Sequence, residues 1–240
     1  MKIDVGTMHF KELNEEIHQC PEKDIHLENC LGQRYIGCGL SGHEVSIHGV
    51  PGNALGAYLD GANLTVWGNA QDATGDTMNE GCIEIHGSSG DATGYAMRGG
   101  MILVEKNVGY RAGIHMKAYE AKMPVLVVGG EAGSFLGEYQ AGGYLIVLGM
   151  DVQGRPPVGR FCAAGMHGGK IFLRADTLPF DLPSQVVAQK AGPEELAEIA
   201  PYLTAYCQAF HVDKDKVMDH SFYVLTPNTT NPYKRLYTTN

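Results

Sequence analysis

Two histidines, His48 and His86, are the first residues in this chain whose types suggest chemistry, because imidazole is a common metal ligand. They occupy the same position in two similar segments, and a segment carrying Trp67 lies between those two. If the three segments are adjacent strands, the two imidazole rings lie about 10 Å apart. Ligands of one zinc ion each lie about 2 Å from it. We therefore predict a stack of solvated side chains here and no metal site.

Two glycine-containing motifs suggest phosphate binding. Gly37-Cys38-Gly39-Leu40-Ser41-Gly42 matches the dinucleotide-binding pattern GxGxxG, which binds phosphate where it opens a helix. Here the alternation typical of a strand resumes at Val45, so we do not predict nucleotide binding. The segment 164–170, Ala-Gly-Met-His-Gly-Gly-Lys, lacks the first glycine of a P-loop.

Arg111, His115 and Lys117 form a basic group that is typical of either an anion site or a salt-bridge cluster at the rim of the fold. No Ser/His/Asp set, paired carboxylates or thiolate with a base can be assembled from the sequence. We expect Asp72 and Asp91 to cap turns. The sequence thus predicts no catalytic, cofactor-binding or metal-binding residue.

Composition excludes several classes of protein. The chain has 18 Lys+Arg against 27 Asp+Glu, a formal net charge of -9, which is the wrong sign for neutralising nucleic-acid phosphates. Its apolar runs are far shorter than the roughly 20 residues of a membrane span. The six cysteines include no CxxC pair, which favours buried free thiols. We expect a soluble, cytoplasmic protein that binds neither nucleic acid nor membrane.

The elements that position these residues are predicted by a repeat of 19 residues. Aliphatic pairs, from Ile25/Leu27 to Ile171/Leu173, recur with nearly this period, and each repeat has a glycine at the corner where positive φ is needed. So short a unit, with two-residue alternation and no helix, is typical of one turn of a parallel β-helix. We predict an all-β fold, a right-handed single-stranded parallel β-helix of about seven turns with short N- and C-terminal helical segments. The corner glycines are Gly37, Gly56, Gly75, Gly94, Gly113 and Gly137.

Columns of equivalent residues predict which side chains face inward. Met78, Met97 and Met116 continue a column that begins with Leu40 and Leu59. This continuity with leucine predicts interior packing, not a copper or haem site.

The outward positions change from polar in the early turns to apolar in the later ones, and exposed apolar surface of this extent marks a covered interface. We expect either the C-terminal segment of the chain or a partner protein to cover it. The predicted interface patch consists of Leu103, Leu126, Val128, Ile146 and Leu148.

Outside the repeat, Thr7 is the expected cap of a short helix, and a second helix is expected over 192–210, where Pro201 should kink it or begin another. Residues 221–240 are expected to be extended chain. The predicted division is an N-terminal helical cap over 1–23, the repeat over 24–175, and a C-terminal helix and tail over 176–240 that packs on the repeat or on a partner. Four extra residues after Glu120 and the run Gly154-Arg155-Pro156-Pro157 predict loops, either functional or merely solvated.

Several linear runs resemble a known family. They are Gly32–Gly37, Val108–Lys117, Gly137–Gly143 and the tail Asn231–Tyr237. Together they resemble the GXGXG domain at the C-terminal end of the glutamate synthase large subunit. The resemblance implies a right-handed β-helix that braces the glutaminase and synthase domains and holds no catalytic residue.

The chain departs from the whole enzyme because it begins Met1-Lys2 and lacks the N-terminal cysteine nucleophile, the flavin barrel and the cluster-binding cysteines. The resemblance therefore implies a non-catalytic scaffold subunit of a multi-subunit glutamate synthase, which forms glutamate from 2-oxoglutarate and glutamine. The flavin and the iron–sulfur cluster would belong to partner subunits of glutaminase and flavin synthase type, with none in this chain. A homo-oligomer is a further alternative.

A second family, the glycine-repeat subunit of formylmethanofuran dehydrogenase, resembles the same repeat and serves a molybdenum or tungsten enzyme. Gln33-Arg34-Tyr35 and the tail favour glutamate synthase. The six-residue period of hexapeptide acyltransferases is absent.

Overall fold

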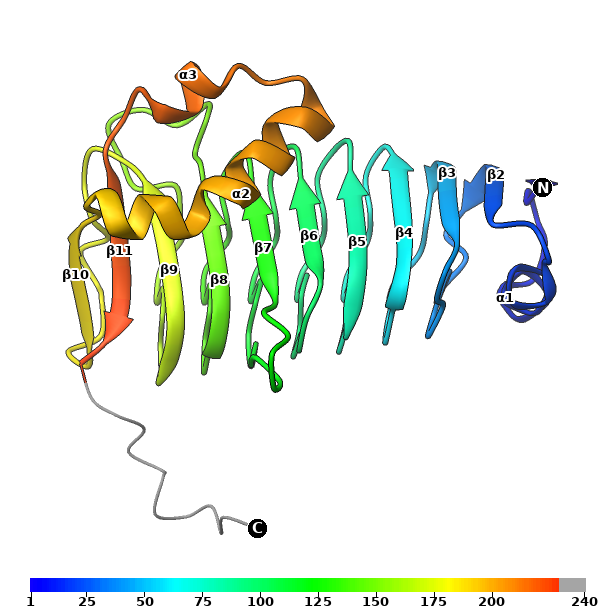
Figure 1. The fold of residues 1–240 in the computed structure, drawn as a ribbon, viewed down its shortest axis with the longest axis horizontal. Helices are drawn as coiled ribbons and strands as arrows, with labels where there is room; N and C mark the ends of the chain where they lie inside the picture. Colours follow the sequence, from blue (N-terminus) through cyan, green and yellow to red (C-terminus); the bar gives the residue numbers. More distant parts are fainter. Residues whose placement is uncertain (229–240) are drawn as a thin grey trace, which may run out of the picture.

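The computed structural model describes residues 1–228, whose strands form one sheet of eleven (Figure 1). Strands β1 to β9 lie in the sheet in chain order, and each is parallel to the one before. This sheet agrees with the predicted all-β class. The parallel strands are β1 (Lys2–Asp4), β2 (Asp24–Leu31), β3 (Glu44–Val50), β4 (Asp60–Trp67), β5 (Glu80–Ile85), β6 (Met101–Val104), β7 (Val125–Val128), β8 (Ala141–Val147) and β9 (Gly168–Arg174).

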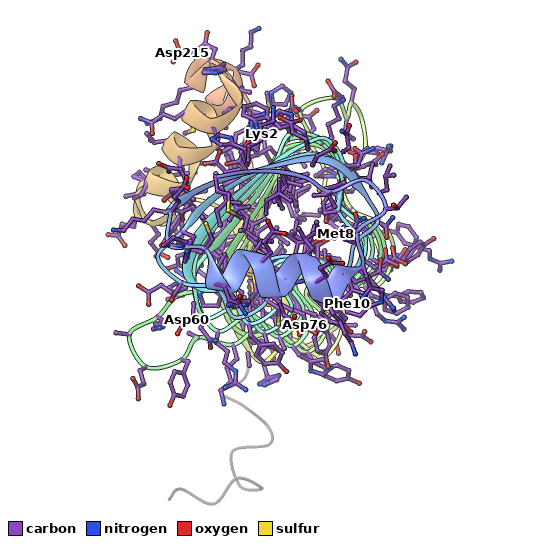
Figure 2. The ribbon with its side chains drawn as sticks, turned by 90° about the vertical axis from the view of Figure 1, so that its right-hand side faces the viewer. Lys2, Met8, Phe10, Asp60, Asp76 and Asp215 are labelled. Carbon is purple, nitrogen blue, oxygen red and sulfur yellow. The ribbon has the colours of Figure 1, made fainter. Side chains whose placement is uncertain are left out.

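The repeat fixes the strand register. Leu64 pairs with Ile83 and Ile83 with Ile102, so the partners in β4, β5 and β6 are 19 residues apart. The connections pair in the same way, because Gly75 donates its amide to the Leu55 carbonyl at 2.8 Å. Seen from the end that carries α1, the strands lie one behind another around an interior filled by side chains (Figure 2).

The corner between consecutive strands depends on backbone with positive φ. The six corner glycines have φ between 63° and 72°. At Gly113, a Cβ atom would lie 2.4 Å from Leu145 Cδ2, so glycine is needed for space as well as for φ. Alanines also adopt positive φ two residues before several of these glycines, as at Ala73 and Ala92. The prediction that Asp72 and Asp91 cap the corners is confirmed, since each accepts an amide hydrogen bond from the next turn, at 2.9 and 2.8 Å.

The methionine column is interior, as predicted. Met78, Met97 and Met116 are fully buried. The equivalent residue of the next turn is Gln140, which is also fully buried and donates from Nε2 to the carbonyls of Gly142 and Gly143 at 3.2 and 3.1 Å.

Helix α1 (Phe10–Gln19) lies across the first turn (Figure 2) and buries Leu13 and Ile17 against the core. The prediction that Thr7 caps it is wrong. His9 is the N-cap, because the chain first turns back through a Met8 to Val5 backbone hydrogen bond and starts the helix later.

At the other end the sheet continues antiparallel through β11 (Phe222–Pro227) and the edge strand β10 (Val186–Lys190). This confirms extended chain for 222–227, while 229–240 lie outside the described residues. Helix α2 (Pro193–Phe210) runs through Pro201 without starting a second helix, because only one amide donor is missing there. Helix α3 (Lys214–Met218) follows, and the sheet extends beyond 24–175 at both ends.

Truncation of the interior column should be costly. Met97→Ala is expected to lower the free energy of unfolding by about 2–5 kcal/mol, since it leaves a cavity among turns that cannot collapse independently. Met123→Ala removes the same atoms from a side chain that is 42% exposed and should cost far less. Chemical denaturation measures both, and equal losses would contradict the interior placement.

Candidate interaction surfaces

The apolar outer face of β6 to β9 is covered by α2 (Figure 1). From the predicted patch, Leu103, Ile146 and Leu148 lie on this face and are buried beneath the helix. The helix contributes Ile199, Leu203, Tyr206 and Phe210. Of the two predicted covers, the C-terminal segment of the chain is therefore the one that the structure shows.

The outward orientation predicted for Leu126 and Val128 is wrong, because both point into the main core. Leu126 pairs with Ile102, and Leu103 pairs with Val127, so Val125 and Val127 face the helix. The phase of β7 is hidden in the sequence because all four of its residues are apolar and buried. The spacing to the next corner glycine would have identified the inward residues of β7. Ile83, Ile102 and Leu126 all face the core, and each lies eleven positions before a corner glycine.

The correct register reveals the role of Gly129, which sequence analysis misses. A Cβ atom on Gly129 would lie 2.0 Å from the Tyr206 hydroxyl oxygen. That hydroxyl donates to the Glu105 carbonyl at 3.2 Å, and burial raises the pKa of Tyr206. Glycine at this position therefore lets the helix lie directly on the strands.

A partly buried ion pair also holds α2 on the sheet. Lys170 Nζ lies 2.6 and 2.7 Å from the two carboxylate oxygens of Glu198, and the Tyr144 hydroxyl donates to Glu198 at 3.0 Å. The hydrogen bond from Lys170 holds the pKa of Glu198 below its usual value. Burial, followed by the bond to Glu198, raises the pKa of Tyr144 to about 12.

Arg174, a buried cation at the end of β9, anchors α3. Its guanidinium donates to the carbonyls of Val217, Leu148 and Lys216 at 2.9, 3.1 and 3.0 Å, and it pairs with Asp219. Hydrogen bonds from His220 and Arg174 hold the pKa of Asp219 below its usual value.

The outer face of β3 to β5 carries the predicted stack. His48, Trp67 and His86 have ring centroids 6.0 and 4.2 Å apart, and Phe210 of α2 packs edge-on against His86 at 5.0 Å. Trp67 is 50% exposed, and its indole N–H donates to Ser46 at 2.9 Å. Trp67 thus lies between the two histidines. Among residues 1–228, no three His, Cys, Asp or Glu side chains converge as metal ligands would.

A second exposed aromatic surface runs along one corner, which we call the arginine–aromatic ridge. Phe135 and Phe161 stack with centroids 5.0 Å apart, and Arg111 lies over Phe135 at 5.1 Å. Arg160 lies over Phe161 and, from the other side, within 6.0 Å of Phe180, which is 87% exposed. Arg111 pairs with Glu138 at 3.3 Å.

The cysteines include no disulfide within the described residues. Burial raises the pKa of the Cys30 thiol to about 11 and those of Cys82 and Cys162 to about 12. Thiols with such pKa values are protonated at neutral pH and are poor nucleophiles.

Comparison with known families identifies the chain, because the model of the GXGXG motif family matches residues 24–229. The chain belongs to this family. The predicted resemblance to the GXGXG domain found in the glutamate synthase large subunit is thereby confirmed.

One relative of this GXGXG chain and one solved structure of similar fold add to this. An uncharacterized protein of Methanocaldococcus jannaschii is 44% identical over 249 residues, which cover 98% of this chain and 95% of the relative. A chain in the crystal structure of the formyltransferase/hydrolase complex (FhcABCD) from Methylorubrum extorquens with methylofuran superposes with a TM-score of 0.61. That match covers 84% of this chain and 72% of the other at 19% identity, so it shows a shared fold. None of the helices within residues 1–228 combines the length and apolar character needed to cross a membrane.

A charge on the covered face of the GXGXG chain should detach the helix. Ile146→Lys places an ammonium group between β8 and α2 and is expected to speed amide exchange in 193–210 by at least about tenfold, since an unpaired charge is costly to bury. Thr65→Lys, at the equivalent outward position of uncovered β4, should leave that exchange unchanged. Unaltered exchange in the Ile146 variant would contradict the covering role of α2.

The ion pair of Glu198 predicts an acid-sensitive contribution to stability. Because the folded pKa of Glu198 is lowered, its stabilisation is present above the unfolded value of about 4.3 and is lost as pH falls through the folded value. Glu198→Gln should cost about 1 kcal/mol at pH 7, after allowance for solvent screening, and nothing in strong acid. Glu15→Gln, an exposed change in the middle of α1, is the control for denaturation measured across pH. A cost independent of pH would rule out the ion pair as its source.

Proposed function

We propose that residues 24–175 form a right-handed single-stranded parallel β-helix of about seven turns, flanked by the cap 1–23 and the segment 176–240. The pairing of strands in chain order supports this, because each strand then returns to the sheet beside its predecessor. Crossovers between parallel strands are right-handed in nearly all known cases.

We further propose that this chain is a non-catalytic, cytoplasmic scaffold subunit of a multi-subunit glutamate synthase. Its partners would be glutaminase-type and flavin synthase subunits, which would carry the flavin and the iron–sulfur cluster and form glutamate from 2-oxoglutarate and glutamine. The observation that carries this proposal is the family match over residues 24–229, since it covers the whole repeat and the whole of α2.

The arrangement of the chain is consistent with such a role. Side chains on the outer faces are held by neighbours from adjacent turns, as Trp67 is by Ser46. A surface fixed in this way keeps its shape when partners bind, which lowers the entropy cost of association.

The alternative is a component like the glycine-repeat subunit of a formylmethanofuran dehydrogenase-type molybdenum or tungsten enzyme. The likeness to a chain of the formyltransferase/hydrolase complex favours it at the level of fold. The same likeness supports an assembly of several subunits for either alternative, since that neighbour is part of a complex.

Purification of the native complex tests these proposals. The full chain, tagged at its natural locus, should co-purify with glutaminase-type and flavin synthase polypeptides, and the complex should form glutamate from glutamine and 2-oxoglutarate. The isolated chain is the control and should be inactive. Molybdopterin-enzyme subunits in place of those partners would support the alternative, and activity of the isolated chain would overturn the scaffold role.

A further inference from the structure

The loop that interrupts the fifth repeat, Lys117–Met123, is held in place and not merely solvated. Tyr119 and Lys122 exchange backbone hydrogen bonds at 3.2 and 2.9 Å across a tight turn. Lys122 Nζ then contacts Glu80 at 2.9 Å and Asp60 at 3.7 Å, two carboxylates of earlier turns. In Figure 1 the loop projects at one edge of the sheet, beside the start of β7. It is therefore folded back over the turns before it.

The folded loop forms one wall of an open pocket of about 290 Å³ whose charged lining residues are all basic. Arg98 and His115 come from consecutive turns, and Lys117 begins the loop. Ala96, Ala118 and the ring of Tyr119 complete the wall with apolar surface. Of the predicted basic group, His115 and Lys117 line this pocket. Arg111 does not, because it pairs with Glu138, and Arg98 supplies the third basic side chain.

Arg98 and Lys117 are equivalent positions of adjacent turns, since the Lys117 amide donates to the Met97 carbonyl at 3.0 Å. Like charges directly opposite one another across adjacent strands repel. Within residues 1–228 neither side chain forms an ion pair with a carboxylate, although the whole chain carries a net charge of -9. The nearby carboxylates of Glu80 and Glu138 are bound by Lys122 and Arg111. Among residues 1–228, therefore, no carboxylate neutralises these two adjacent cations, which line the pocket beside the loop.

The third basic side chain is fixed in orientation. The His115 ring lies parallel to Tyr139, with centroids 5.3 Å apart, and meets Tyr95 edge-on at 5.9 Å. A ring held in this way forms its part of the pocket wall at little cost in entropy when a ligand binds.

We propose that this pocket binds a small organic anion with two negatively charged groups, carboxylate or phosphate. One group binds between Arg98 and Lys117 through charge-assisted hydrogen bonds, and the second lies toward His115. The body of the ligand packs against Ala118 and Tyr119. The volume suits a molecule of metabolite size, at the lower end of ligand pockets.

Isothermal titration calorimetry of the full chain tests this with isophthalate as the dicarboxylate probe, pyrophosphate as the phosphate probe and benzamide as a neutral probe. At least one dianion should bind with one-to-one stoichiometry and a Kd below ~1 mM at low ionic strength, and benzamide should not bind. Which dianion binds more tightly distinguishes the two chemistries.

Arg98→Gln and Lys117→Gln should each weaken that binding by about tenfold or more, since each removes a charge-assisted hydrogen bond. Lys106→Gln, an equal change of charge at an exposed lysine outside the pocket, is the matched control and should leave Kd unchanged. Circular dichroism checks that the variants fold, and Arg98→Met or Lys117→Met, which also removes the charge, replaces the corresponding variant if it does not. Absence of saturable binding by both dianions, or equal weakening by the Lys106 variant, would overturn the proposal.

Discussion

The hydrogen bonds between equivalent positions of adjacent turns determine which side chains of the strands and corners face the interior and which face outward. From β3 to β6 strand residues pair with partners 19 residues away, and corner amides such as that of Gly75 donate to the preceding turn. A shift of one residue in any turn would move its inward side chains to the outside. Additional residues are therefore accommodated where no such pairing is required, as in the loop Lys117–Met123, while Val125 returns to the sheet beside Met101.

The close pairing of equivalent positions in adjacent turns also explains why the chain contains as many as 32 glycines. A corner glycine such as Gly113 faces the interior, where a Cβ atom would strike the leucine of a neighbouring turn. Alanines such as Ala92 adopt equally positive φ at a cost of about 1 kcal/mol each, because nothing at their positions forbids a Cβ atom. Burial of the interior column offsets that strain, as each large apolar side chain contributes roughly 1.5–3 kcal/mol.

Periodicity predicted the strand order of the repeat and the interior position of Met78 and Met97, because both depend only on spacing. Periodicity placed Leu126 and Val128 on the wrong face, because β7 is apolar on both faces and the extra residues before β7 interrupt the 19-residue spacing. Gly129, Arg174 and Glu198 could not be assigned from the repeat, because their partners lie in helices whose position on the sheet no spacing encodes. The pocket beside the loop was missed for the same reason. Arg98 and Lys117 are 19 residues apart, but only the folded loop converts that column into a concave surface.

The two halves of the sheet consequently present different surfaces. On β6 to β9 the outward residues are apolar, and α2 occupies them, so a partner could reach Ile146 only by displacing the helix and exposing its buried face. On β3 to β5 the outward residues are polar or aromatic, and Trp67 stays half exposed. The arginine–aromatic ridge is likewise exposed, yet Phe135 and Phe161 of adjacent turns stack on one another and Arg111 lies over Phe135. Because backbone hydrogen bonds between turns fix the spacing of the residues that carry these side chains, the exposed surfaces present a defined arrangement, and preorganisation of this kind lowers the entropy cost of binding a partner.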